Sequence, residues 1–211
     1  MSHDDFATEP IPGLPERLPE GETILWQGRP DWWALTREAL SLWWVMGYFC
    51  LLAAWRFASV MDELPLGQAI GAAVPFLLLA GVVAGLLILT AVIQARATVY
   101  TVTNRRVAMR IGAALTLTLN LPYTQIARAD LALGRRGTGT IAFSILGPRR
   151  IAYLVAWPHV RPWRFHTEPA LRCIPEAAHV AGLIAEAAET RLSVPQVSRR
   201  PAPTAAAVAA E

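Results

Sequence analysis

Two pairs of arginine residues are the first candidates for chemistry in this sequence. Arg105 and Arg106 lie in the stretch YTVTNRRVAMRIG, which begins at Tyr100, and Arg135 and Arg136 lie in GRRGTG. Guanidinium groups bind phosphate oxygens through paired hydrogen bonds, and a basic side chain near an anionic bilayer contributes about 1 kcal/mol to membrane binding. Because the first pair follows a long uncharged run closely, we expect these loops to contact membrane lipid or an acidic partner. The alternative is that one arginine of the first pair binds a carboxylate or carbonyl oxygen inside the domain and fixes the turn, while the other is solvated.

A second candidate is the proline-rich stretch WPHVRPWRFHTEPALR. Aromatic and basic side chains are interspersed along it, namely those of Trp157, Arg161, Trp163 and Arg164. Its prolines disfavour a regular strand or helix and reduce the entropy that is lost on docking. Since tryptophan and arginine are enriched at interface hot spots, we expect this stretch to bind a partner protein. The alternative is a loop that folds back over the sheet and buries its own rings.

No constellation typical of an enzyme, a metal site or a cofactor site occurs in the sequence. His159 and His166 have no thiol or carboxylate at metal-ligand spacing, and the two cysteines, Cys50 and Cys173, lie far apart. There is neither a phosphate-binding glycine loop nor a nucleophile elbow. A membrane-tethered domain also has no obvious groove to offer to nucleic acid. We therefore predict a non-enzymatic binding protein with no metal, no cofactor and no nucleic-acid partner.

Two long apolar segments must position these residues. With 54% hydrophobic and 17% charged residues, the chain is too apolar for an ordinary soluble domain. Residues 39–61 contain one charged residue, Arg56, and residues 64–95 contain none. Each segment reaches the roughly 20 residues that a helix needs to cross the hydrocarbon core. We therefore predict a two-helix transmembrane hairpin over residues 39–95.

The arginines also predict the orientation of this hairpin. Arg29 and Arg37 precede the first span and Arg96 follows the second, whereas only Arg56 marks the connection between the spans. Because basic residues near span ends stay on the cytoplasmic side, both termini are expected in the cytoplasm. The expected location is a bacterial inner membrane, either cytoplasmic or intracytoplasmic.

Small residues form one face of the second span. Gly67, Gly71, Gly81 and Gly85 fall on one side of a helix, within the segments GQAIG and GVVAG. Such a face lets another helix backbone come close. It suits a homodimer seam, packing against the first span, or docking on a subunit of a larger complex.

After Arg96 the hydrophobic period changes from that of a helix to that of a strand. Alternating and β-rich runs predict at least four strands and as many as seven, and PRRIAYLVAW is interpreted as one of them. PEAAHVAGLIAEAAETRL then has an apolar stripe at helical spacing. We expect a mainly-β domain with a C-terminal helix over residues 96–192 and a disordered tail over residues 193–211. Residues 1–38 are expected to form an N-terminal cytoplasmic arm and a membrane-proximal segment.

The stretch YTVTNRRVAMRIG resembles the signature of bacterial pleckstrin-homology-like domains, in which such a turn follows a pair of membrane spans. Together with GLPERLPEGETILWQGRPDWWAL, LPYTQIARADLAL and WPHVRPWRFHTEPALRCIP, nearly the whole chain resembles the PuhB family of photosynthetic reaction-centre assembly proteins. The resemblance implies a factor that helps to assemble the reaction centre with its core light-harvesting antenna. Its partners would be the reaction-centre and core antenna subunits. The alternative function is a general membrane-surface module that binds lipid or senses envelope stress through its arginine loops.

Overall fold

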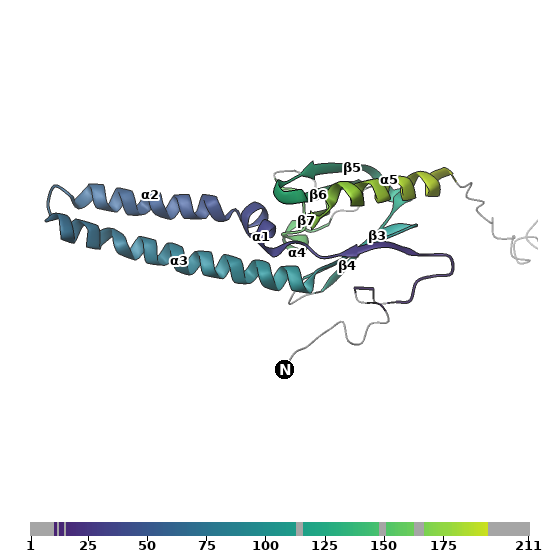
Figure 1. Ribbon diagram of the computed structural model, residues 1–211, viewed down its shortest axis with the longest axis horizontal. Helices are drawn as coiled ribbons and strands as arrows, with labels where there is room; N and C mark the ends of the chain where they lie inside the picture. The colour runs from purple at the N-terminus through teal and green to yellow at the C-terminus, as the bar shows by residue number, and fades with distance from the viewer. Residues whose placement is uncertain are drawn as a thin grey trace, which may run out of the picture.

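A helical hairpin projects from a β domain and makes the molecule elongated (Figure 1). This computed structural model describes residues 11, 13, 14, 16–112, 116–147, 151–162 and 167–193. The hairpin consists of helix α2 (Leu42–Val60) and helix α3 (Leu66–Ala97). A short helix α1 (Trp32–Ala34) and a π-helical turn η1 (Leu35–Ala39) precede it.

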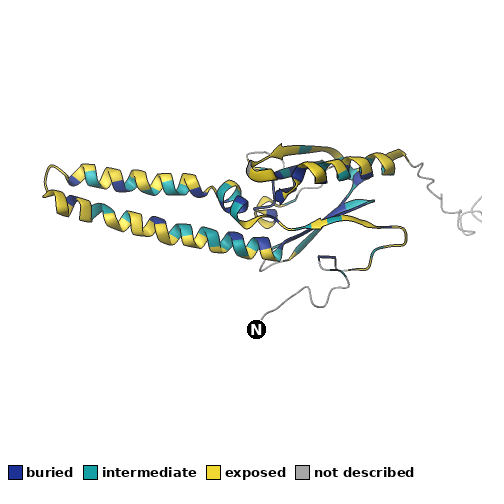
Figure 2. Ribbon diagram, in the orientation of Figure 1, coloured by how far each residue is buried: buried dark blue, intermediate teal, exposed yellow. Residues whose placement is uncertain are grey.

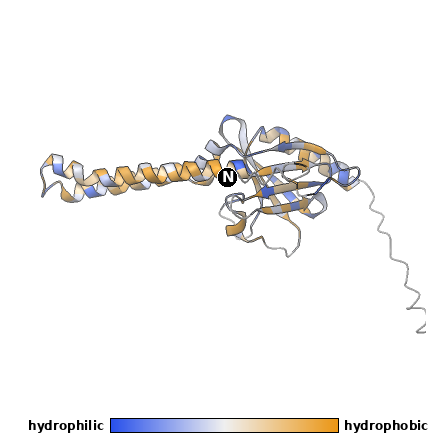
Figure 3. Cartoon of the chain, turned by 90° about the horizontal axis from the view of Figure 1, so that it is seen from below, coloured by the Kyte–Doolittle hydropathy of each residue, from blue (hydrophilic) through white to orange (hydrophobic). Residues whose placement is uncertain are grey.

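Helices α2 and α3 are long and apolar enough to cross a membrane, judged by length and composition. Only 11% of the most apolar window of each helix is buried inside the protein. Figure 2 shows exposed residues along both helices, and Figure 3 shows that most residues of the hairpin are hydrophobic. A core helix of a soluble protein would bury such residues, so this exposure is typical of membrane spans.

The two long helices pack through small side chains. Ala69, Ala80 and Ala91 are the most buried residues in the body of α3, and they recur every 11 residues. Leu42 and Ala53 of α2 are buried with the same spacing. A period of 11 residues corresponds to three helical turns, so these residues stay on one side of each helix.

The β domain consists of two antiparallel sheets and a C-terminal helix. The first sheet has the order β1 (Ile24–Gly28), β2 (Val99–Thr103), β3 (Arg106–Ile111) and β4 (Leu117–Pro122). The second has the order β5 (Ile126–Leu133), β6 (Thr138–Ile145) and β7 (Ala170–Pro175). A short helix α4 (Tyr153–Ala156) lies in the β6–β7 connection, and helix α5 (Ala177–Ser193) follows β7. This arrangement confirms the expected mainly-β domain with its C-terminal helix.

The hairpin is an insertion between two paired strands. β1 pairs with β2 in antiparallel fashion, and Gly28 lies opposite Tyr100. Both ends of the hairpin therefore lie on the same side of any bilayer that it crosses. The structure differs here from the expected division of the chain, because the strand within residues 1–38 is part of the β domain.

The prediction of a strand in PRRIAYLVAW is wrong at Tyr153–Ala156, because these residues form a helical turn. A short apolar run does not distinguish a buried strand from a helix by periodicity.

The core lies between the two sheets and α5. Tyr100 and Met109 from the first sheet and Phe143 from the second have no exposed surface. The expected apolar stripe of α5 is confirmed, since Val180 and Ile184 are buried against these residues. A second, smaller cluster joins the base of the hairpin to the domain. It contains Ala34, Leu35, Leu40, Ala91 and Cys173.

Gly139 of β6 allows α5 to approach the sheet closely. A Cβ atom at this position would lie 2.6 Å from the Cβ of Ala177 and 2.9 Å from the carbonyl oxygen of Ala132. Gly139→Ala is therefore expected to destabilise the protein by about 1–3 kcal/mol, the usual cost of overpacking. Thermal unfolding in detergent should show a lower Tm. As a matched control, Gly81→Ala should not lower the Tm, because a Cβ at Gly81 meets nothing within 4 Å.

Candidate functional site

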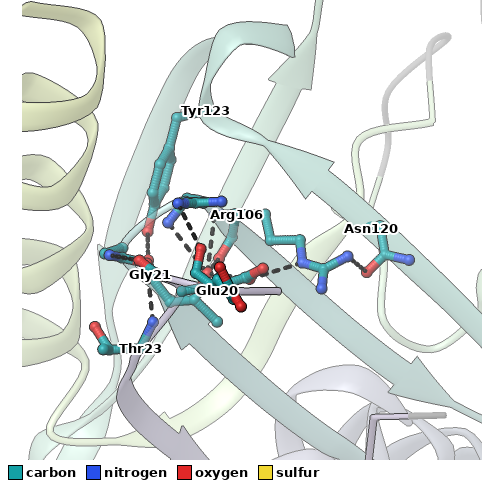
Figure 4. A network of polar contacts seen from close by, with 10 residues as sticks. Glu20, Gly21, Thr23, Arg106, Asn120 and Tyr123 are labelled. Atoms are coloured by element: carbon teal, nitrogen blue, oxygen red, sulfur yellow. Dashed lines mark hydrogen bonds and ion pairs between the residues drawn. The ribbon is translucent and has the colours of Figure 1, made fainter. Parts of the chain in front are cut away.

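The turn between β2 and β3 holds the segment that leads into β1 (Figure 4). Arg106 Nε donates a hydrogen bond of 2.8 Å to Glu22 Oε1, and the Thr103 hydroxyl lies 2.9 Å from the same oxygen. The Glu22 side chain is only 2% exposed. Arg106 Nη1 also donates to Asn120 Oδ1 at 3.4 Å. Arg106 therefore neutralises a buried carboxylate.

Asn104 and Arg105 bind the same segment through its backbone. Arg105 Nη2 donates to the carbonyl oxygen of Glu20 at 3.0 Å, and Asn104 Nδ2 donates to that of Gly21 at 2.9 Å. Asn104 Oδ1 accepts from the N–H of Thr23 at 3.1 Å. The observed contacts agree with the alternative in which an arginine binds inside the domain and fixes the turn. They differ from it in that both arginines, and not one, make such contacts.

This turn points away from the hairpin. β2 begins two residues after α3 ends, and its five residues extend the chain by roughly 16 Å at about 3.3 Å each. The structure therefore places Arg105 and Arg106 at the end of the domain opposite the hairpin, not beside the bilayer as expected. The prediction was wrong because β2 runs straight away from the end of α3 and takes the following turn with it.

The second arginine pair lies at the hairpin side of the domain. Arg135 and Arg136 form the turn between β5 and β6, and Arg136 is exposed with a left-handed φ of 59°. A Cβ atom on the preceding Gly134 would lie 3.1 Å from Glu38 Oε1. Because Glu38 belongs to η1, which immediately precedes α2, this turn adjoins the start of the first long helix.

The proline-rich stretch is held on the second sheet in the part that the structure describes. Arg161 Nη1 lies 2.6 Å from Asp130 Oδ2 and 3.3 Å from Glu168 Oε2. Hydrogen bonds from Arg128 and then from Arg161 lower the pKa of the Asp130 carboxyl. Trp157 remains 40% exposed, whereas Trp163 and Arg164 lie outside the described residues. Arg161 thus holds the loop on the sheet. Trp157, in contrast, has an exposed ring that a partner could contact.

A buried polar cluster connects the hairpin to the domain. His159 is 1% exposed, its Nδ1 lies 2.5 Å from the Tyr100 hydroxyl, and its Nε2 lies 3.1 Å from Thr98 Oγ1. The Tyr100 oxygen accepts from the N–H of Arg172 at 3.3 Å, so its proton is available for His159 Nδ1. The His159 Nε2–H then donates to Thr98, the residue that immediately follows α3. Sequence reasoning missed this cluster because Thr98 and Tyr100 precede His159 by about 60 residues.

Burial keeps the ionisable groups of this cluster uncharged. Burial, and then the nearby charge of Arg172, lowers the pKa of His159 to about 3. Burial also raises the pKa of Tyr100 well above its usual range, and it raises the pKa of the Cys173 thiol to about 12. A neutral histidine, a neutral phenol and a neutral thiol favour a structural role here over acid–base or nucleophilic chemistry.

A cavity of ≈ 220 Å³, which we call the junction cavity, opens where the domain meets the start of α2. It is lined by Glu38, Ala39, Ser41, Tyr153, Trp157, Val160, Pro162 and Arg172. Arg172 is 7% exposed, and its Nη1 donates to the carbonyl oxygen of Val160 at 2.9 Å. Arg172 Nε has no hydrogen-bond partner among the described residues. The same part of the chain contains no group of three or more His, Cys, Asp or Glu residues that could hold a metal ion.

The glycine face of α3 points away from α2. Cβ atoms placed on Gly67, Gly71, Gly81 and Gly85 would meet nothing within 4 Å. The glycines therefore do not pack against the first span, which was one of the three uses considered for them. A homodimer seam and docking on another subunit remain predictions.

Comparison with known proteins agrees with this architecture. The family described as Bacterial PH domain matches residues 42–188, which include both long helices and most of the β domain. The chain is 50% identical over 214 residues to an "Uncharacterized 23.7 kDa protein in puhA 5'region" of Rhodobacter capsulatus, with both chains covered completely. No solved structure is significantly similar to the chain. Because the family match extends over more than half of the chain, the protein belongs to the bacterial PH domain family.

Proposed function

We propose that this protein is a non-enzymatic assembly factor of the PuhB family, which helps to assemble the photosynthetic reaction centre and its core light-harvesting antenna. The observation that supports this proposal most strongly is the relative of 50% identity, whose name places its gene in a photosynthesis gene region. In this proposal the factor acts through transient protein contacts at the cytoplasmic face of the inner membrane, with both termini in the cytoplasm.

The exposed faces of the hairpin are suited to contacts with membrane-embedded subunits. On α2, Trp44, Tyr48 and Trp55 recur at helical spacing and are 84%, 58% and 71% exposed. On α3, the glycine face is open to another helix. Trp157 adds an aromatic side chain at the base of the hairpin. In our proposal these surfaces hold incoming subunits while the complex forms.

The arginine-based alternative has less support. As a general lipid-binding or envelope-stress module, the domain would use Arg105, Arg106, Arg135 and Arg136 together. Arg105 and Arg106 are instead bonded to Glu20 and Glu22 at the end of the domain opposite the hairpin.

Deletion of the gene tests the proposed role. We expect weaker reaction-centre and core-antenna absorption bands with normal growth under conditions that do not require photosynthesis. Unchanged bands would reject the assembly role. Reporters that are active only in the periplasm should be active when fused at Asp62 and inactive when fused at Glu211.

A point variant tests the glycine face within the same assay. Gly81→Leu with Gly85→Leu should lower the absorption bands while the protein itself accumulates normally, because a Cβ atom at either position meets nothing within 4 Å. Leu79→Ile, on another exposed side of α3, is the matched control and should leave the bands unchanged. Normal bands in the double variant would show that this face does not bind the subunits.

A further inference from the structure

We propose that the junction cavity binds the headgroup of a zwitterionic phospholipid. The phosphodiester would lie on Arg172, and the ammonium group would lie beside Glu38 and the rings of Tyr153 and Trp157. This site shares Trp157 with the surfaces proposed to bind subunits, but it does not depend on the assembly role and would remain if that role were rejected.

The phosphate end of the site follows from Arg172. This guanidinium is almost fully buried, yet its Nε–H group has no hydrogen-bond partner among the described residues, while Nη1 is used by Val160. Leaving a buried charged donor unpaired is unfavourable. A phosphate oxygen in the cavity would accept this hydrogen bond, and planar guanidinium groups are well suited to phosphodiesters. The neighbouring Cys173 adds no charge, because its thiol has a pKa of about 12.

The ammonium end follows from the other lining residues. Glu38 brings a carboxylate to the cavity wall, where its Oε2 lies 3.8 Å from Cys173 Sγ. A purely anionic headgroup would be repelled by this carboxylate, whereas a zwitterion places opposite charges against both Arg172 and Glu38. Tyr153 and Trp157, each 40% exposed, present aromatic rings that attract ammonium groups.

The position of the cavity favours a lipid over a free phosphate. Ser41, one of its lining residues, immediately precedes α2, whose Trp43 and Trp44 are 65% and 84% exposed. Tryptophan at such a position is typical of the headgroup level of a bilayer. Helix α4 lies at the hairpin side of the domain (Figure 1), and it exposes Leu154 (86%) and Val155 (55%) next to the cavity residue Tyr153. Acyl chains can continue from the cavity along these apolar surfaces.

The size of the cavity fits a headgroup. Its volume of ≈ 220 Å³ is many times the roughly 10–15 Å³ that one water molecule requires. This space is large enough for a phosphate and an ammonium group.

Native mass spectrometry of the full-length protein tests the proposal. The protein would be released from nanodiscs containing equal amounts of phosphatidylethanolamine and phosphatidylglycerol with identical acyl chains. We expect one phosphatidylethanolamine to be retained, several-fold more often than phosphatidylglycerol. Equal retention, or a preference for phosphatidylglycerol, would overturn the proposal. If millimolar inorganic phosphate displaces the bound lipid completely, the proposal that the ligand is a lipid would be rejected.

A pair of glutamate variants locates the site. Glu38→Gln removes the carboxylate from an exposed position and should abolish the preference for phosphatidylethanolamine. Glu63→Gln, at the opposite end of the hairpin, should leave the preference unchanged. A preference that survives Glu38→Gln would overturn the assignment of the ammonium group to this cavity. Arg172→Lys keeps the charge but loses the planar donor group, and it should lower the retention of both lipids.

Discussion

Arg106→Ala is expected to lower the Tm of the detergent-solubilised protein by roughly 10 °C, as measured by circular dichroism. The reason is the Glu22 carboxylate, whose side chain is 2% exposed and receives a hydrogen bond of 2.8 Å from Arg106 Nε. Removing one partner of a buried ion pair typically destabilises a protein by about 3–5 kcal/mol, because the remaining charge is left unpaired.

The adjacent arginine provides the control for this prediction. Arg105 is half-buried and donates one described side-chain hydrogen bond, to the carbonyl oxygen of Glu20, so Arg105→Ala should cost about 1 kcal/mol or less. Equal losses in the two variants would contradict the role assigned to Glu22. Combining Arg106→Met with Glu22→Gln should recover part of the lost stability, since no buried charge then remains.

The second large effect is a loss of stability in mildly acidic solution. Burial lowers the pKa of His159 to about 3 in the folded protein, against an ordinary value of 6.5 that applies when the chain unfolds. Between these values the unfolded chain binds one more proton, so the stability from this group is complete above pH 6.5 and is lost as the pH falls towards 3. From pH 7.5 to pH 5 we expect the free energy of unfolding to fall by about 2 kcal/mol. Thermal unfolding at several pH values measures this change.

His159→Gln isolates this contribution. Glutamine can donate and accept a hydrogen bond but does not titrate, so the variant should be less stable at pH 7.5 and lose less stability on acidification. Asp130 does not interfere above pH 5. Because its pKa is lowered from 3.8, its contribution is present above that ordinary value and is lost only as the pH falls below it. An unchanged slope between pH 5 and pH 6.5 in the variant would contradict the assignment to His159.

The elements that could be predicted from the sequence are those with a strong local pattern. The two apolar segments predict α2 and α3, and the apolar stripe of residues such as Val180 and Ile184 predicts α5. Tyr153–Ala156 were misinterpreted as part of a strand because four apolar residues fit either a strand or a helix.

The contacts that build the candidate sites could not be predicted in the same way. Glu22 and Arg106 are 84 residues apart, and Tyr100 and His159 are 59 apart, so no local period indicates that they meet. The junction cavity has the same origin, since Glu38 and Arg172 come from opposite ends of the domain sequence. The position of the Arg105–Arg106 turn, however, could be predicted from the sequence. Extending a strand of five residues from the end of α3 already places this turn far from the bilayer.

The insertion of the hairpin between β1 and β2 fixes an order of events during biosynthesis. The ribosome releases β1 first, and this strand has no partner until both long helices have been translated and the chain has returned to the side from which it started. In the proposed membrane location, closure of the first sheet, together with burial of Glu22, therefore requires that both helices have been inserted. In that setting, a nascent chain whose second helix fails to insert would keep β1 as an unpaired strand edge.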